Sequence, residues 1–121
     1  MALVADPHYL PAVVIALPAE IDMANASQVG QQLSSTLAVG VRAVIADMSA
    51  TTFCDSSGIS MLVQAHKQAD ANGTQLRLVV RSTSVLRALT LVRIDQLLPI
   101  YANLSQALAA AAEPGPPPRH E

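Results

Sequence analysis

Aromatic residues are scarce in this chain. Its 121 residues include one Phe, two Tyr and no Trp. Large rings usually contribute much of the buried area of a small core, so here the core has to consist of Val, Leu, Ile, Ala and Met. The length predicts a single domain. A domain of this size can bury enough apolar surface to fold without a metal or a disulfide.

Cysteine and positive charge are also limited. Cys54 is the only cysteine, which excludes an intramolecular disulfide and argues against a cysteine-based zinc site. A lone cysteine suits a reducing compartment. The seven basic residues are scattered and the net charge is −2, so there is no basic stripe of the kind that binds nucleic acid. We expect no metal, no cofactor and no direct contact with nucleic acid.

Membrane and export signals are missing as well. Pro, Asp or Arg interrupts every apolar stretch well short of the ~20 residues that a membrane span needs. Residues 1–11 have neither a basic start nor a long apolar run, so they do not resemble a signal peptide. The sequence therefore predicts a cytoplasmic protein that makes no membrane contact.

The chain does contain a regular alternation of strand and helix patterns. Continuous apolar runs predict buried strands at 13–15, 41–50 and 75–80, and Pro99 places a short strand, 97–101, at a sheet edge. Helices are predicted between the capping residues at 22–27 and Gly40, from about Ser57 to Asn72, over 82–94 and over 103–112. Residues 113–121 are proline-rich and are expected to be disordered.

This order of elements predicts an α/β fold. We expect one domain, residues 1–112, with a mixed β-sheet of four to five strands and about four helices packed on it. Two apolar stripes should face the core. The first is Ile59, Leu62, Val63, His66 and Ala69, and the second is Val85, Leu86, Leu89 and Val92. On the first stripe, His66 is expected to be a structural, buried or half-buried histidine.

One stretch, Asp55-Ser56-Ser57-Gly58, has two interpretations. Asp55 or Ser56 can cap the helix that follows. A helix start also suits an anion, including a phosphate on one of its own serines. Gly58 fits a simple cap poorly, because glycine inside a helix costs up to ~1 kcal/mol. From this stretch alone both interpretations remain open.

The wider pattern resembles the STAS domain of bacterial anti-sigma factor antagonists over roughly residues 12–110. That family combines an acid in an early turn, an Asp-Leu-Ser type strand end, and Asp-Ser-Ser/Thr-Gly before a helix. Two positions depart from the pattern: Ala19 replaces a turn glycine, and Arg93 stands where relatives often have glycine. The matching residues, in order and spacing, are Asp22, Asp47, Ser49, Phe53, Asp55, Ser56, Ser57 and Gly58.

The resemblance implies a switch that controls transcription. The unmodified protein would bind an anti-sigma factor, which then releases a sigma factor. The anti-sigma factor would also be a serine kinase that phosphorylates Ser56, and a serine phosphatase would reverse the reaction. The residues that the resemblance assigns to partner binding are Asp22, Asp55, Ser56, Ser57 and Gly58.

Two other functions compete with this switch. A STAS domain can also be a scaffold that is not phosphorylated, or a subunit of a lipid transporter or of a larger signalling assembly. A serine hydrolase is disfavoured, because there is no Gly-x-Ser-x-Gly motif. His66 would also lie roughly 15 Å from Ser56 along one helix. We therefore expect no catalytic residue and no enzyme activity. Cys54, next to an acid, is expected to be unreactive.

Overall fold

Strands and helices alternate along the chain in the computed structural model, which describes residues 12–38 and 41–112. The predicted N-terminal segment, Gly40 and the tail 113–121 lie outside the described residues. The elements, in order, are β1 (Val13–Ala16), β2 (Glu20–Ile21), α1 (Ala26–Leu37), β3 (Ala43–Met48), β4 (Phe53–Cys54), α2 (Ser56–Ala71), β5 (Gln75–Val80), α3 (Thr83–Leu91), η2 (Ile94–Gln96), β6 (Ile100–Tyr101) and α4 (Leu104–Ala112).

The main sheet has the strand order β1-β3-β5-β6. Its three strand pairs are all parallel, with Val44 of β3 aligned to Val13 of β1 and to Leu76 of β5. A helix connects each strand to its neighbour, as parallel pairing requires. The predicted α/β fold with four helices is confirmed. We expected a mixed sheet, whereas all described strand pairs are parallel.

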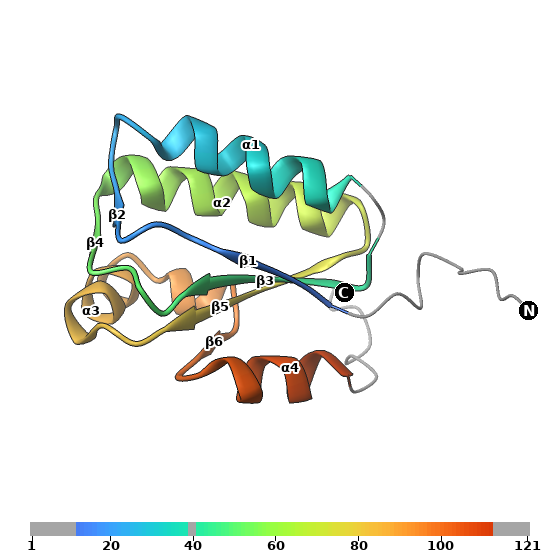
Figure 1. Cartoon of the computed structure of the whole chain (residues 1–121). Coiled ribbons are helices and arrows are strands. Elements are labelled where there is room, and N and C mark those ends of the chain that lie inside the picture. Colours follow the sequence, from blue (N-terminus) through green and yellow to red (C-terminus); the bar gives the residue numbers. More distant parts are fainter. Residues whose placement is uncertain (1–11, 39–40, 113–121) are drawn as a thin grey trace, which may run out of the picture.

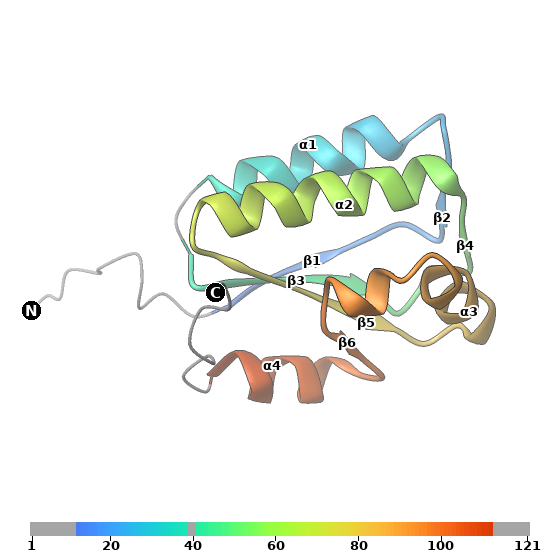
Figure 2. The same ribbon diagram turned by 180° about the vertical axis from the view of Figure 1, so that it is seen from behind.

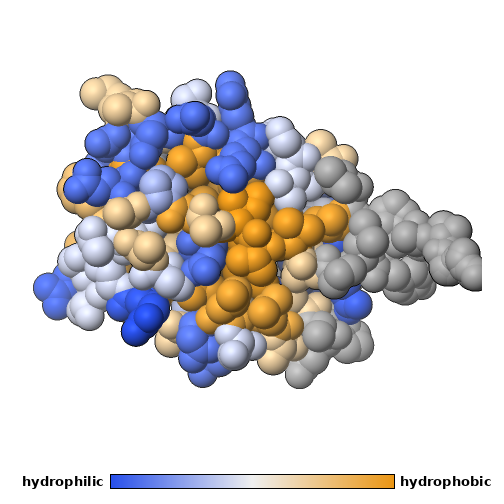
Figure 3. All heavy atoms as spheres, viewed as in Figure 1, coloured by the Kyte–Doolittle hydropathy of each residue, from blue (hydrophilic) through white to orange (hydrophobic). Residues whose placement is uncertain are grey.

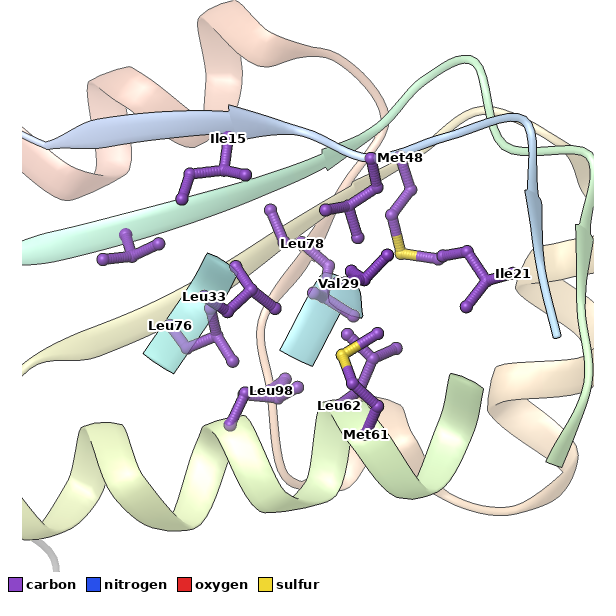
Figure 4. Packing of buried hydrophobic residues seen from close by; sticks show 14 of the residues in the cluster. Ile15, Ile21, Val29, Leu33, Met48, Met61, Leu62, Leu76, Leu78 and Leu98 are labelled. Carbon is purple, nitrogen blue, oxygen red and sulfur yellow. The ribbon is translucent and has the colours of Figure 1, made fainter. Parts of the chain in front are cut away.

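The larger core lies between the sheet and the helix pair α1 and α2 (Figure 1). The two helices pack against each other and cover the same face. Leu33, Leu37 and Leu62 are fully buried there. Figure 4 shows aliphatic and Met side chains from the sheet, from β2 and from both helices pointing into this space. The core is therefore made of the residue types that the lack of aromatics predicted.

The other face of the sheet is covered by α4 (Figure 2). Its buried apolar cluster is small and consists of Ile45, Val79 and Ala107. Beside them Arg77 is only 7% exposed. Its guanidinium lies over the Tyr101 ring, 5.7 Å from the centroid, and donates to the Tyr101 hydroxyl and the Gln75 amide oxygen. Nothing in the pattern of the strand indicated that this arginine is buried.

The prediction that β1 is a buried strand is wrong. Among the described strands β1 lies at the edge of the main sheet, and Val14, on the face opposite the larger core, is 39% exposed. Leu108 of α4 is exposed to the same extent. An apolar area crosses the middle of the surface where β1 and α4 lie (Figure 3). The apolar run could not reveal this, because it does not encode the position of the strand in the sheet.

The predicted stripes of α2 and α3 are partly correct. On α2, Leu62 and Ala69 are buried and His66 is half-buried, as expected. On α3, Val85 and Leu89 are buried, but Leu86 and Val92 are exposed. α3 ends at Leu91, earlier than predicted, so Val92 lies beyond the helix and does not continue its buried side. No helix in the described part of the chain is long and apolar enough to cross a membrane.

Candidate functional site

A two-stranded parallel ribbon brings the predicted site residues together. Ile21 of β2 is aligned with Cys54 of β4, and the Asp55 N–H donates to the Ile21 carbonyl at 3.1 Å. Paired strands lie about 4.8 Å apart, so the loops that begin with Asp22 and Asp55 are neighbours. The ribbon stands at one end of the molecule, below the starts of α1 and α2 (Figure 1).

The sequence analysis missed this ribbon. Each of its strands has only two residues, which is too short for an alternation pattern to be visible. A weaker signal was present: an acid follows a buried apolar residue in both places, as Ile21-Asp22 and as Cys54-Asp55. That repetition indicates two strand ends that finish side by side.

Asp55 caps α2. One carboxylate oxygen, Oδ1, accepts from the backbone N–H of Ser57 at 2.9 Å and of Gly58 at 3.2 Å. Asp55 itself has extended backbone angles, as an N-cap residue should. The structure therefore selects Asp55 over Ser56 as the cap. Ser56 becomes the first residue of the helix, and its side chain is exposed.

The two serines lie in different surroundings. Ser57 is half-buried and lines a groove of about 660 Å³ between α1 and α2, opposite small residues such as Ser27 and Gly30. Ser56 is not among the residues that line the groove. An enzyme that approaches the end of the helix can reach the Ser56 hydroxyl without entering the groove.

Gly58 is required by packing. It is buried beneath the ribbon, and a Cβ at this position would lie 2.6 Å from the Cys54 sulfur and 2.8 Å from Cγ2 of Ile21. Both distances are far below normal van der Waals contact. This explains why a glycine follows the capping residues at a cost in helix propensity. Gly58 thus lets α2 sit close to the ribbon, and its contribution to any partner contact is indirect.

Cys54 is a buried thiol. Burial, and to a smaller extent the negative charge of Asp55, raises its pKa to about 11. The thiol is therefore protonated at neutral pH and is a poor nucleophile. The expectation that the neighbouring acid disfavours the thiolate is confirmed.

Asp22 shapes the loop before α1. Its carboxylate accepts from the Ala24 N–H at 2.9 Å, and its own N–H donates to the Asn25 side-chain oxygen at 2.9 Å. Asn25 also donates to the Glu20 carbonyl. The N-cap position of α1 is Asn25, whose side chain makes no capping bond. Asp22 does not cap α1 either, so the capping explanation that its sequence position allowed does not apply.

Asp47 and Ser49 hold the loop that leads to β4. The Asp47 carboxylate accepts from both the backbone N–H and the hydroxyl of Ser49. Farther along the loop, the buried Thr51 hydroxyl donates to the Pro18 carbonyl at 2.8 Å, and the Thr52 N–H donates to the Ala19 carbonyl. These bonds fix β4 beside β2. The two matching residues therefore support the site without forming its surface.

The two departures from the family pattern differ in their backbone. Arg93 has a left-handed conformation, with φ of 67°, and it is the only non-glycine residue with a positive φ in residues 12–38 and 41–112. The backbone at Ala19 is therefore one that any residue can adopt, and it does not require glycine. Arg93, in contrast, occupies a position whose geometry favours glycine.

Nothing at this site suggests a metal or an enzyme. Residues 12–38 and 41–112 contain no group of three or more His, Cys, Asp or Glu side chains that could hold a metal ion. His66 lies on α2, ten positions after Ser56. Two residues so far apart on one straight helix do not meet, so His66, the only histidine in the described part of the chain, cannot act as a base for Ser56 or Ser57.

Comparison with known proteins identifies one protein family and several solved structures of similar fold. A model of the STAS domain family matches residues 4–107. An anti-sigma factor antagonist from Mycobacterium paratuberculosis is 27% identical, with a TM-score of 0.79 over 92% of each chain. The phosphorylated Bacillus cell fate determinant SpoIIAA is 21% identical, with a TM-score of 0.62 over 81% of this chain and 88% of that one. A sulfate transporter family protein from Wolinella succinogenes is also 21% identical, with a TM-score of 0.68 over 88% and 95%.

Proposed function

Because the chain belongs to the STAS domain family, we propose that it is an anti-sigma factor antagonist. In this proposal it is a cytoplasmic partner switch and not an enzyme. Unphosphorylated, it binds an anti-sigma factor that has serine kinase activity, and the sigma factor is released for transcription. Phosphorylation of Ser56 by that kinase ends the binding, and a serine phosphatase restores it.

The observation that carries the proposal is the position of Ser56. It is the exposed first residue of a helix whose cap is supplied by Asp55, so its hydroxyl takes no part in capping. The paired strands place the Asp22 loop beside it. An exposed hydroxyl next to an exposed acidic loop is accessible to a kinase and can lie within a protein contact. A scaffold has no need of a serine in this position.

The physical effect of a phosphate at Ser56 favours a switch. It adds about −1.5 to −2 charges at neutral pH close to the carboxylates of Asp22 and Asp55. The positive end of the α2 dipole offsets the resulting repulsion by roughly 0.3–1 kcal/mol. The side chain already faces solvent, so the domain can accept the phosphate without refolding. A partner seated on this surface would meet a new, strongly hydrated charge.

The neighbours support the same proposal. One is described as an anti-sigma factor antagonist and another was solved in a phosphorylated form. In this chain Ser56 and Asp55 occupy the site through which such a protein would be controlled. Asp22 supplies an acid on the adjoining loop, where a cationic group of the partner can bind.

Binding of an anti-sigma factor kinase from the same organism tests the proposal. Unphosphorylated wild type and Ser56→Ala should bind with similar affinity, because the substitution removes one exposed hydroxyl. Ser56→Glu should bind more weakly, and the phosphorylated wild type most weakly. Ser57→Glu is the matched control, since it adds the same charge one residue away, on a side chain that lines the groove. Equal affinity of all these forms would refute the switch.

A second candidate rests on the Wolinella neighbour. Its description as a sulfate transporter family protein shows that the same fold occurs in transport proteins. In that case the domain would be a non-phosphorylated module of a transporter or of a larger signalling assembly, including the lipid transporter considered above. A chain that no serine kinase modifies, and that co-purifies with a membrane protein regardless of substitutions at Ser56, would favour this alternative.

A further inference from the structure

The outer face of α3 has no role in the site described above, although it is unusually apolar. Leu91 is 77% exposed and Val92 is 53% exposed, and Leu86 is also exposed. Single exposed apolar residues are common on protein surfaces. Here three large ones lie within seven residues of the sequence, in α3 and directly after it. Clusters of exposed apolar residues often mark contact surfaces.

Helix geometry places two of these residues away from the core. Val85 and Leu89, four residues apart, are buried against the rest of the domain. At 3.6 residues per turn, Leu86 and Leu91 point away from that buried side, and Arg87 lies between them. The outward side of α3 therefore carries Arg87 with an exposed leucine on each flank, and the exposed Val92 follows directly after the helix.

Arg93 extends this surface at a cost in backbone energy. Its N–H donates to the Thr90 carbonyl at 3.0 Å and closes the last turn of α3. The left-handed conformation at this position is one that glycine adopts freely, whereas a residue with a Cβ is strained there. A strained non-glycine residue at the surface is a reason to look for function. An exposed guanidinium is what glycine could not supply here.

The charges of this region are mostly positive. Residues 81–94 contain three exposed arginines, Arg81, Arg87 and Arg93, and no acid, and an exposed acid, Asp95, follows directly. The ribbon beside the serine site has the opposite sign, with Glu20, Asp22 and Asp55. A partner that covers both surfaces therefore needs cationic groups against the ribbon and carboxylates against α3.

The two surfaces are close enough for one partner to cover. α3 lies at the same end of the molecule as β2 and β4 in both views (Figures 1 and 2), and it contacts β4 directly. Phe53 of β4, three residues before Ser56, is itself exposed. The strand that leads to the serine site and contacts α3 thus carries an exposed aromatic side chain.

We propose that the outer face of α3, formed by Leu86, Arg87, Leu91, Val92 and Arg93, selects the partner by binding a segment of it that carries both apolar and carboxylate side chains. This inference rests on the proposed function and adds a specificity surface to it. The apolar side chains bury area against the segment. Arg87 and Arg93 pair with its carboxylates. A chain with glycine in place of Arg93 could not make this ion pair.

The test uses the full chain, unphosphorylated, and the purified anti-sigma factor kinase, with affinity measured by calorimetry. Leu91→Ser and Arg93→Glu should each weaken binding by about tenfold or more, as residues at the centre of an interface do. Leu86→Ser should weaken it less. Leu108→Ser is its matched control, because Leu108 and Leu86 are 39% and 40% exposed but lie on different helices. Lys67→Glu controls for charge reversal. Both controls should bind within about twofold of wild type.

Arg93→Gly separates contact from fold. It should raise the melting temperature, because the backbone strain is removed, and still weaken binding. A purely structural residue would not give opposite signs in the two measurements. The same thermal melts show whether a variant is folded, so weaker binding is not mistaken for misfolding.

The outcomes separate the two proposals. If wild type binds the kinase but Leu91→Ser and Arg93→Glu bind equally well, the α3 inference is overturned and the proposed function stands. If wild type does not bind, both are overturned. Wild type and the variants should also be sedimented with vesicles that contain phosphatidylglycerol. Vesicle binding that is lost in Leu91→Ser would overturn the inference in favour of an anionic membrane surface, and self-association that is lost in Leu91→Ser would overturn it in favour of a second copy.

Discussion

The starts of α1 and α2 lie side by side, yet they are built differently. At the start of α2, the Asp55 carboxylate accepts two backbone N–H groups and Gly58 packs beneath the ribbon. At the start of α1, the side chain of the N-cap residue makes no capping bond, and the Asp22 carboxylate accepts only from the N–H of Ala24 in its own loop. Similar sequence features, an acid after a buried residue, therefore serve different purposes.

The difference indicates which residues maintain the fold of the site and which one is available for partner recognition. The α2 start is a rigid platform that holds Ser56 at the surface, and it depends on Asp55 and Gly58 for its shape. The α1 start is a loop whose acid stabilises little beyond its own turn. Residues of the platform should therefore affect folding first, whereas Asp22 should affect partner recognition first.

The largest effect is expected for Gly58→Val. The new side chain would overlap the Cys54 sulfur and Ile21, and overpacking of this kind typically costs 1–3 kcal/mol or more. Urea denaturation measures the loss. Gly30→Ala is the matched control, since the nearest atom to a Cβ there is Cγ of Met61 at 3.1 Å, which a flexible side chain can move. Equal stability of wild type and Gly58→Val would show that the ribbon does not constrain α2.

A second test of the platform uses pH. Burial raises the pKa of the folded Cys54 thiol from its ordinary value of 9.0 to about 11. The unfolded chain therefore ionises first as pH rises, so the stability that Cys54 contributes is complete below about pH 9 and is lost towards pH 11, on the order of 1 kcal/mol per pKa unit.

Cys54→Ala provides the comparison for this pH effect. Its free energy of unfolding should fall less steeply than that of wild type between pH 9 and 11. Parallel profiles for the two proteins would mean that the thiol is not protected by the ribbon. Slow labelling of the native thiol by a disulfide reagent at pH 8, and rapid labelling in urea, is the corresponding kinetic result.

Loss of the cap should have an intermediate effect. Asp55→Ala removes the acceptor for the Ser57 and Gly58 N–H groups, and such losses cost about 1 kcal/mol. Asp55→Asn keeps an acceptor and should be close to wild type in thermal melts. If Asp55→Ala melts like wild type, the observed hydrogen bonds do not stabilise the start of α2.

The smallest effect on folding is expected for Asp22→Asn, with a large effect on recognition. The amide oxygen can still accept from the Ala24 N–H, so the free energy of unfolding should change by less than about 0.5 kcal/mol. Phosphorylation of Ser56, partner affinity or both should fall sharply. Circular dichroism melts beside a binding titration measure the two quantities. A large drop in melting temperature with normal affinity would make Asp22 structural.

Much of the architecture could be predicted from the sequence. The continuous apolar runs of β3 and β5 indicated buried strands, and the spacing of Leu62 and Ala69 indicated the buried side of α2. Such elements are determined by local periodicity. The serine at the start of a helix and the acid before it were also visible.

The remaining features depend on contacts between distant segments. The edge position of β1 follows from strand order, which four apolar residues do not encode. The ribbon of β2 and β4 is too short to have a pattern. The reason for Gly58 is the position of Cys54 and Ile21 after folding, and burial of Arg77 depends on Tyr101 from another strand. None of these can be read from neighbours in sequence.

The most direct test of the account is to identify the residue that the kinase modifies. The full chain is incubated with the anti-sigma factor kinase and ATP, digested, and analysed by phosphopeptide mass spectrometry with fragment ions that separate the two serines. The exposed Ser56 should carry the phosphate, and Ser56→Ala should carry none at either position. Phosphate confined to Ser57, or absent from both serines of the wild-type chain, would contradict the account.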